Sequence, residues 1–424
     1  MTPELEGILR NTVISEDEPG SILHDFEVML AFAQEAPLTL TASLNPSMKA
    51  CSALNERVRR KVEHGLTRPT LKSYPHIGGL FLLLRASGLT TVETVGRKSV
   101  LVVDSAVLAS WRALTAEERY FALFESWLMR GDSEIIGEQR GRFMYNPIYF
   151  QWASFFEHFV ADRWHDDDWV ERVRYHPGFY ILALMELFGL VEIEDGPVQA
   201  GQSWRIADVE PTAWGVTLLA ALFENDLLTD FAFWRQLERP EQIAPGVLQP
   251  YLQPYRPDWQ QTLQLPGASF QQGMFVFKVS VFKDVWREIF MPGGSTLEDL
   301  SDAILNAYDF DNDHLYRFLY ATRFGNTAEV SHPMMKDGPF TEEGPYVDEV
   351  CIGDLPAQPG FHMIYNFDFG DNWNFDVLLE RIEPAEPIGE PYRIGARHGE
   401  SPPQYEYAED DEWWDDDGDE EMMG

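Results

Sequence analysis

The chain has 424 residues, of which 45% are hydrophobic and 13% aromatic, so it can bury several cores, and two or three domains are expected. Its net charge of −38 argues against general binding to the phosphate backbone of nucleic acids. Only Cys51 and Cys351 are present, which excludes a disulfide framework and any cysteine-rich metal site. No apolar run is long enough to cross a bilayer and the first residues lack a secretory pattern, so we expect a cytoplasmic protein without membrane contact.

The first residues predict two helices. Over 21–33, apolar residues recur at helical spacing behind Ser21, a residue type that caps helices. A second helix is expected over about 48–63, and it carries the cations Arg57, Arg59, Arg60 and Lys61. Between Lys49 and Arg130 there are 13 Lys and Arg residues against 7 Asp and Glu, so this part of the chain could still face a polyanion.

An internal repeat follows. The first copy has an apolar helix that stops at Gly88, two strand-like runs and a helix near Trp111, and the second has a helix that stops at Gly189, two such runs and a helix near Trp214. This order of elements is the one found in winged-helix modules. We therefore predict a mostly helical region with two winged-helix-like repeats, the first within residues 1–145 and the second within 146–238.

Two interpretations of the repeats stay open. A winged helix can place a helix in a DNA groove, or it can serve as a scaffold that packs on protein. The basic balance of the first repeat favours DNA contact as an alternative, whereas the 17 acidic and 6 basic residues from Tyr149 to Glu241 oppose it for the second. For the whole chain, the net charge of −38 disfavours DNA binding.

Prolines mark the next boundary. Their density predicts a linker over 239–272, because proline interrupts helices and central strands; they are Pro240, Pro245, Pro250, Pro254, Pro257 and Pro266. Residues 398–424 form an acidic tail. From Glu400 to Gly424 there are 12 acidic residues and no Lys or Arg, so we expect this tail to be disordered.

The segment between linker and tail, residues 273–397, predicts a β-rich domain. A strand over 274–282 and a hairpin partner over 285–291 lead through a turn to a helix over 297–307, for which Thr296 is the expected cap. Further strands are expected over 314–320, 363–369 and 375–382. A hairpin followed by a helix is a grasp-like opening, here of a mixed sheet, and the whole chain is therefore expected to be of the α+β class.

Five short segments of this domain are informative because of their order and spacing. They are Phe277-Lys-Val-Ser-Val, Val285-Trp-Arg-Glu-Ile, Thr296-Leu-Glu-Asp-Leu-Ser-Asp-Ala-Ile, Asp311-Asn-Asp-His-Leu-Tyr-Arg-Phe and Tyr365-Asn-Phe-Asp-Phe-Gly-Asp-Asn-Trp. Together they resemble the plasmid pRiA4b ORF-3-like family, over about 125 of the 424 residues. The two repeats also look like the extension of its longer members.

That resemblance implies a family without a settled activity. Some of its members carry a transposon-passenger or resolvase-like label, which implies a link to plasmids and mobile elements but no mechanism. Compact members continue into a segment with cysteine and paired prolines, whereas this chain keeps only Pro402 and Pro403. No serine with clustered arginines is present to act as a resolvase nucleophile.

Polar and aromatic residues of the C-terminal domain are candidates for a binding groove: Trp286, Arg287, His314, Asp368, Asp371 and Trp373. Arg287 is expected to pair with a carboxylate such as Asp371, or with an incoming acidic peptide. The alternative is a buried Arg–Asp pair that fastens the hairpin to the sheet.

An Asp/His cluster offers a possible site for a divalent cation, since carboxylate oxygens suit Mg²⁺, Mn²⁺ or Ca²⁺. The candidate ligands are Asp311, Asp313, His314, Asp368 and Asp371. In the alternative, the first aspartates end a helix, and Asp368 and Asp371 hold a tight turn around Gly370. An EF-hand is excluded, because its loop would need glycine at His314 and glutamate at Tyr320.

The function that these patterns favour is non-enzymatic binding or regulation of a protein partner through the C-terminal sheet, with no cofactor. Two alternatives remain: a DNA-associated regulator of a mobile element that acts through the basic first repeat, and a metal-dependent hydrolase at the Asp/His cluster.

Overall fold

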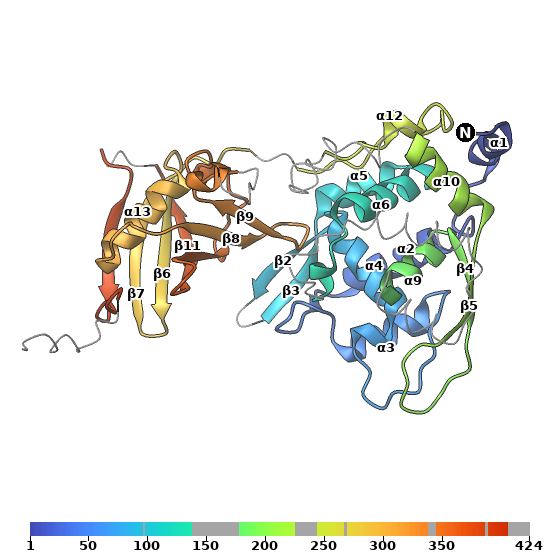
Figure 1. Ribbon diagram of the computed structural model, residues 1–424, viewed down its shortest axis with the longest axis horizontal. Helices are drawn as coiled ribbons and strands as arrows, with labels where there is room; N and C mark the ends of the chain where they lie inside the picture. Colours follow the sequence, from blue (N-terminus) through green and yellow to red (C-terminus); the bar gives the residue numbers. More distant parts are fainter. Residues whose placement is uncertain are drawn as a thin grey trace, which may run out of the picture. The chain divides into compact units, whose positions relative to one another are not determined.

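The computed structural model describes residues 1–95, 98–137, 178–224, 244–266, 269–337, 345–385 and 389–405. The chain divides into two compact units: unit 1 is Met1–Ala268 with Ala321–Ala328, and unit 2 is Ser269–Tyr320 with Glu329–Gly424. Unit 1 is mostly helical and unit 2 is built on a large sheet, which confirms the α+β class (Figure 1). Within the described residues, no helix is long and apolar enough to cross a membrane.

Unit 1 contains a series of mostly short helices: α1 (Pro3–Asn11), α2 (Ile22–Glu35), α3 (Met48–Arg57), α4 (Pro75–Ala86), α5 (Ser105–Ala113), α6 (Ala116–Arg130), α9 (Phe179–Leu187), α10 (Ala213–Glu224) and α12 (Gln249–Leu252), with 3₁₀ turns at Leu71–Ser73 and Ser133–Ile136. α2 lies where the apolar spacing predicts it. α3 ends at Arg57, earlier than expected, because the backbone N–H groups of Arg59 and Arg60 donate to the buried carboxylate of Asp25 instead of continuing the helix.

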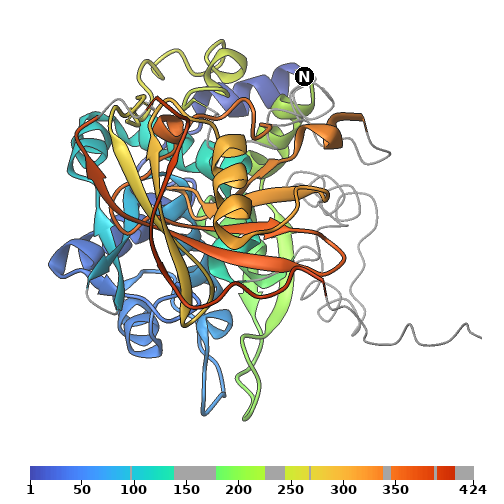
Figure 2. The ribbon, with the colours of Figure 1, turned by 90° about the vertical axis from the view of Figure 1, so that its left-hand side faces the viewer.

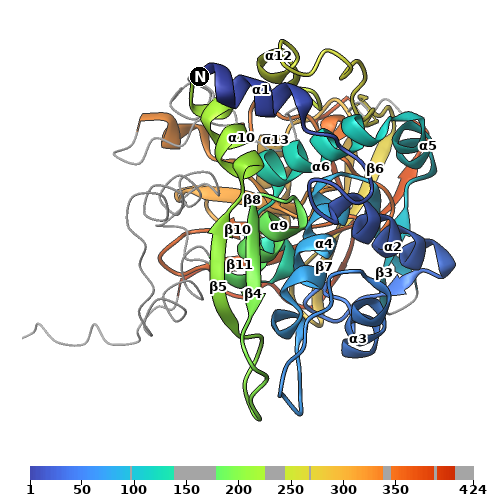
Figure 3. The same ribbon diagram turned by 90° about the vertical axis from the view of Figure 1, so that its right-hand side faces the viewer.

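The repeat predicted from the sequence is present as an order of elements. α4 is followed by Gly88, the strands β2 (Thr90–Val95) and β3 (Lys98–Val103), and α5; α9 is followed by Gly189, β4 (Val191–Asp195) and β5 (Ile206–Pro211), and α10. Figure 3 shows the β4–β5 hairpin with α9 beside it. The two glycines have φ of +75° and +71°, which only glycine adopts without strain. A short strand, β1 (Leu38–Thr39), extends the first hairpin. The winged-helix identity stays a prediction.

Both copies of the repeat share one hydrophobic core. The indole N–H of Trp214 in the second copy donates to the hydroxyl of Tyr120 on α6 at 2.8 Å, and that hydroxyl donates to the carbonyl of Phe188 at 2.7 Å. α4 and α9 approach closely at Gly79, where an added Cβ atom would lie 2.7 Å from Leu184. The described part of the proline-rich segment, 244–266, joins the same core through Leu248, Leu252, Trp259 and Leu263.

Unit 2 is built on a seven-stranded sheet. Its strands are β6 (Met274–Phe282), β7 (Val285–Pro292), β8 (Tyr316–Ala321), β9 (Thr327–Ser331), β10 (His362–Phe367), β11 (Trp373–Glu383) and β12 (Arg393–His398), in the order β12-β7-β6-β11-β10-β8-β9. Where the sequence suggested a mixed sheet, the pairings with a known register are antiparallel. Short turns join β6 to β7 and β10 to β11, and such turns can only connect antiparallel neighbours.

One face of this sheet is covered by α13 (Leu297–Tyr308) (Figure 1). Thr296 caps the helix as predicted, and its hydroxyl accepts a hydrogen bond from the N–H of Asp299. The apolar stripe of α13 is buried against the inward residues of the strands, and two 3₁₀ turns at Pro333–Asp337 and Ile352–Asp354 flank the sheet. The hairpin-then-helix opening is confirmed, whereas β9 and β12 are strands that the sequence did not predict.

Candidate functional site: the turn between β10 and β11

The turn that joins β10 to β11 is held in one shape by its own polar groups. The carboxylate of Asp368 accepts a hydrogen bond from the N–H of Gly370 at 2.9 Å, and its carbonyl oxygen accepts one from the N–H of Asn372 at 2.6 Å. Asp368 and Asn372 have φ of +51° and +55°, the left-handed region that Asp and Asn enter more easily than other side chains. The turn is therefore a preformed, rigid feature of the surface.

Behind the turn lies Asn366, a buried residue to which the sequence analysis gave no role. Its side-chain amide donates to the side-chain oxygens of Asn372 and Asn374 at 2.9 and 3.2 Å, and its oxygen accepts from the guanidinium of Arg317 at 3.2 Å. Arg317 is fixed in turn by an ion pair with Glu329 at 3.0 Å. The turn and strand β8 are thus connected through one buried amide.

His314 lies between two carboxylates beside this turn. Its Nε2 atom is 3.5 Å from an oxygen of Asp368 and 3.6 Å from one of Asp313. Both distances are longer than those of good hydrogen bonds. The ring packs edge-on against Phe367 at 5.9 Å.

Two apolar side chains are exposed at the same place. Leu315 is 37% and Phe369 42% exposed, and they are connected because the N–H of Asp368 donates to the carbonyl of Leu315 at 3.0 Å. The guanidinium of Arg317 lies 5.1 Å from the centre of the Phe369 ring. We call the following set the turn patch: Asp311, Asp313, His314, Leu315, Phe369, Asp371 and Trp373.

Trp373 forms the inner wall of the turn patch. Its ring packs edge-on against Phe310 at 5.1 Å, which attaches the patch to the core under α13. The indole nitrogen is buried and has no acceptor within the part of the chain that the structure describes. His314, Asp368, Asp371 and Trp373 are therefore brought to one place, as the sequence analysis expected, while their use in binding stays a prediction.

Arg287 is not part of this patch. It is 3% exposed and donates to the carbonyls of Ala307 at 2.9 Å and His398 at 3.0 Å, and to the hydroxyl of Ser401 at 2.7 Å, with Tyr308 stacked 4.5 Å away. Its expected pairing with Asp371 is wrong, because carbonyl and hydroxyl oxygens satisfy its donors instead. Arg287 therefore fastens the C-terminal end of α13 to the chain after β12.

Trp286 lies on the opposite face of the sheet from Arg287, because neighbouring residues of a strand alternate between faces. It packs against the ring of His398 at 5.9 Å and the ammonium of Lys278 at 4.9 Å. The predicted binding residues thus fall into three places rather than one groove: the turn patch, the buried site of Arg287 and the open face of the sheet.

The segment after β12, residues 399–405, reaches back to the turn patch. The side chain of Gln404 accepts from the N–H of Asp311 at 2.5 Å and donates to its carbonyl at 3.2 Å. The hydroxyl of Tyr405 donates to Asp313 at 2.6 Å, which lowers the pKa of Asp313 and raises that of Tyr405 to about 12. The backbone of Asp311 and the carboxylate of Asp313 are therefore hydrogen-bonded to the chain's own segment 399–405.

The candidate metal ligands are not arranged as a metal site. Within the described residues, no group of three or more His, Cys, Asp or Glu side chains is placed to hold a metal ion. Gln404 and Tyr405 bind the carboxylate of Asp313, and the N–H of Gly370 binds that of Asp368. These carboxylates have hydrogen-bonding roles in the fold.

Comparisons with known proteins bear on this unit. Residues 276–421 match the family model of the plasmid pRiA4b ORF-3-like protein. The resemblance predicted from the sequence is thus confirmed for this C-terminal part. Among solved structures, a protein of unknown function from Methanosarcina mazei Go1 is similar, with 23% identity over 31% of this chain and 73% of its own length and a TM-score of 0.27. No curated protein matches the chain.

Outside residues 276–421, the four cations proposed for nucleic-acid contact lie in unit 1. Each is paired with a carboxylate of the same unit: Arg57 with Glu35, Arg59 with Asp17, Arg60 with Glu186 and Asp195, and Lys61 with Glu56. The local excess of basic residues is therefore at least partly neutralised within the fold.

Arg60 is the centre of the largest of these networks. It donates to Glu186 at 2.7 Å and to both oxygens of Asp195 at 2.7 and 2.8 Å, while the buried His76 contacts Glu186 at 2.7 Å and Trp204 donates to Asp195 at 2.8 Å. Burial alone would raise the pKa of Asp195, but the hydrogen bonds from Arg60 and Trp204 lower it below its ordinary value. The network joins the segment after α3 to the second copy of the repeat.

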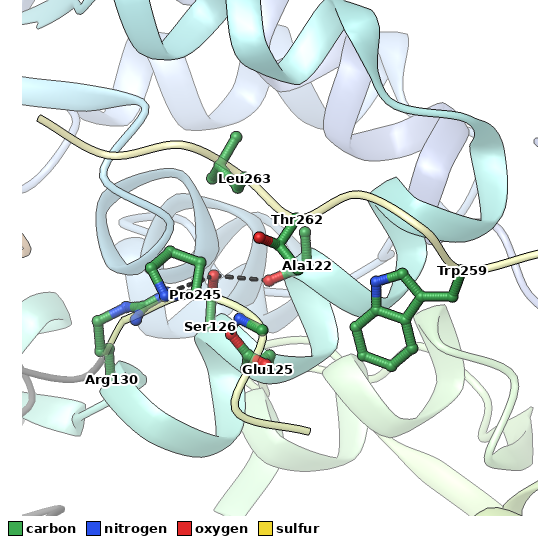
Figure 4. A pocket seen from close by; sticks show the side chains of 9 residues that line it. Ala122, Glu125, Ser126, Arg130, Pro245, Trp259, Thr262 and Leu263 are labelled. Atoms are coloured by element: carbon green, nitrogen blue, oxygen red, sulfur yellow. Dashed lines mark hydrogen bonds between the residues drawn. The ribbon is translucent and has the colours of Figure 1, made fainter. Parts of the chain in front are cut away.

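A small cavity lies in unit 1 between α6 and the proline-rich segment (Figure 4). Its volume is about 10 Å³, room for roughly one water molecule. Glu125 accepts from the N–H groups of Gly246 at 2.7 Å and Leu248 at 3.0 Å, and burial raises the pKa of its carboxyl group. Arg130 is also buried there, which lowers its pKa to about 10. The cavity is too small for a substrate. The hydrogen bonds to Glu125 fasten the proline-rich segment to α6.

Proposed function

We propose that unit 2 is a non-enzymatic binding domain that presents the turn patch to a protein partner. The observation that carries this proposal is the exposure of Leu315 and Phe369 on a backbone that Asp368, Asn372 and the buried Asn366 hold rigid. Exposed apolar side chains on a preformed surface lose little conformational entropy when a partner covers them. Such side chains are typical anchors of protein interfaces.

The chemistry of the turn patch indicates the kind of partner. Asp311 and Asp371 have no ion pair within the described residues, and along the chain Asp311 lies four residues from Leu315 and Asp371 two residues from Phe369. Because acidic groups attract cationic segments and repel anionic ones, we infer a partner segment that carries apolar side chains between Lys or Arg residues. The net charge of −38 supports the same choice, since it steers basic partners toward the protein.

Among the residues that the structure describes, no observation favours the other two candidate functions. The cations of the DNA-binding alternative are paired within unit 1, and two of the candidate metal ligands, Asp313 and Asp368, accept hydrogen bonds. The association with plasmids or mobile elements and the cytoplasmic location remain predictions from the sequence.

The proposal is tested by capture of partners on full-length protein with single changes at exposed phenylalanines. Phe369→Ser removes the centre of the patch, and Phe282→Ser is the matched control, since Phe282 is 55% exposed on the β6–β7 turn. We expect a partner that the wild type and Phe282→Ser retain and that Phe369→Ser loses by at least tenfold. Equal retention by all three proteins would reject the turn patch as the binding surface.

A further inference from the structure

Strand β12 is an open edge of the unit 2 sheet. It pairs only with β7, and within the described residues no strand lies on its other side (Figure 2). Arg393, Arg397 and His398 are exposed along it. An exposed edge presents unpaired backbone N–H and C=O groups that can accept a further strand.

Three cations at or near this edge have no carboxylate partner among the described residues. Arg393 lies 3.6 Å from the ring centre of Phe290, and Lys278 lies 4.9 Å from that of Trp286, yet neither they nor Arg397 form an ion pair with any described residue. Arg381 on β11 contrasts with them, because it pairs with Glu288 at 3.1 Å. Arg393, Arg397 and His398 lie on β12 itself, whereas Trp286 lies on the neighbouring β7 and Lys278 on β6; we call these five residues the cationic edge.

Residues 406–424 have the opposite chemistry. They contain 11 acidic residues, no Lys or Arg, and the aromatic residues Tyr407, Trp413 and Trp414. We propose that this segment binds the cationic edge of its own chain, as an extended strand added to β12. Acidic side chains would then meet Arg393 and Arg397, and aromatic side chains would extend the stack of Lys278 and Trp286.

The path of the chain permits this arrangement. The chain leaves β12 at His398, and residues 399–405 end where Gln404 and Tyr405 are fastened to Asp311 and Asp313. A segment of seven residues reaches at most about 25 Å, so an equal number, 406–412, is long enough to return to the end of β12. The following residues, including Trp413 and Trp414, would then run antiparallel to β12, the direction already used throughout the sheet.

Because residues 406–424 belong to the same chain as the cationic edge, a weak attraction between them is sufficient for binding. Exposed ion pairs contribute little individually, but a segment held on the same chain has an effective concentration of the order of millimolar. A dissociation constant of the order of 50 μM for the free segment would therefore leave the edge mostly occupied in the intact chain. The cationic edge is separate from Leu315 and Phe369, so this proposal does not depend on partner binding at the turn patch.

A chain that ends at Tyr405 and a labelled peptide of residues 406–424 test the proposal by fluorescence anisotropy. We expect the shortened chain to bind the peptide, at least tenfold more weakly at 500 than at 50 mM NaCl, and the full-length chain to bind it at least tenfold more weakly than the shortened one. Arg393→Glu should weaken binding at least fivefold, whereas Lys336→Glu, the same charge change at an exposed cation paired with Glu349, should not. Thermal melting confirms that each protein is folded.

Hydrogen exchange gives a second measurement on the full-length chain. The outward amides of β12 should be protected in the wild type and should exchange at least tenfold faster in Arg393→Glu and in the shortened chain. No peptide binding by the shortened chain, or equal binding by both chains, would overturn the proposal. A full-length dimer that becomes a monomer on shortening would place the segment on a second copy and overturn the arrangement within one chain. Phe369→Ser should leave all these values unchanged, which separates this proposal from the proposed function.

Discussion

The two units use their positive charges in different ways. In unit 1, Arg60 is enclosed by Glu186 and Asp195, and the described neighbours on the same segment are paired as well. In unit 2, Arg393 and Lys278 lie over aromatic rings and form no ion pair with a described carboxylate. A local excess of basic residues in a sequence therefore does not locate a binding surface. What matters is whether the fold places carboxylates beside them.

The largest expected effect comes from breaking the enclosed pair in unit 1. Arg60→Ala leaves Glu186 and Asp195 without their cation. The Glu186 side chain is only 16% exposed, and removing one partner of such a mostly buried pair costs about 3 kcal/mol of unfolding free energy. Arg57→Ala is the control, because Arg57 and Glu35 are both well exposed and such pairs contribute less than about 1 kcal/mol. Urea unfolding of the full-length protein measures both. Equal losses would show that the Arg60 network is no more than a surface contact.

A second change asks whether unit 2 also encloses a cation. Arg287→Met deprives the carbonyls of Ala307 and His398 of their donor, and we expect a loss of about 2 kcal/mol, since buried unsatisfied acceptors are costly. Arg381→Met is the matched control on the same sheet, where the partially exposed side chain makes surface ion pairs worth less than about 1 kcal/mol. The melting temperature of unit 2 reports both. An unchanged melting temperature with lost partner capture would instead assign Arg287 to binding.

Much of the fold could be predicted from the sequence because its signals are local. Alternation and a capping threonine placed β6, β7 and α13 within one residue of their observed limits. β12 was missed because its exposed residues show no apolar alternation, and α3 was extended too far because the competing Asp25 lies more than 30 residues away in the sequence. A helix end that is set by a residue distant in the sequence produces no periodic pattern in the sequence.

The candidate site was predicted less well, for the same reason. Arg287 was recognised as important, but its acceptors come from Ala307 and from the chain after His398, which no local pattern connects to it. Asn366 was missed although alternation does place it on the face opposite Tyr365 and Phe367. The sequence signal for a role of Asn366 was its position as a polar residue between two aromatic residues of a strand.

The pH dependence of stability separates two carboxylates of unit 1. The raised pKa of Glu125 means that its contribution is fully present below the unfolded value of about 4.3 and is lost as pH rises through its folded value. The lowered pKa of Asp195 has the opposite sign: its contribution is present above about 3.9 and is lost as pH falls through its folded value.

Glu125→Gln should therefore flatten the decline of unfolding free energy above about pH 4.3, a decline of at most about 1.4 kcal/mol per pH unit for one proton. Asp195→Asn should flatten the acid side instead. Urea unfolding between pH 3 and 8 measures both slopes. If the wild type and Glu125→Gln change in parallel above pH 4.3, the buried carboxyl does not titrate with folding.

The smallest expected effect concerns the backbone of the turn patch. Asn372 has φ of +55°, and its side-chain oxygen accepts a hydrogen bond from Asn366. Asn372→Ala loses this hydrogen bond and places alanine in a left-handed conformation that asparagine adopts more easily. We expect it to lower the unfolding free energy by about 1 kcal/mol. Asn372→Gly loses the same hydrogen bond but adopts this conformation freely, so it should be more stable than the alanine variant. Chemical unfolding gives the difference. If alanine and glycine are equally stable, the backbone conformation of the turn is not under strain, and the rigidity on which the turn patch depends comes from the side-chain amides alone.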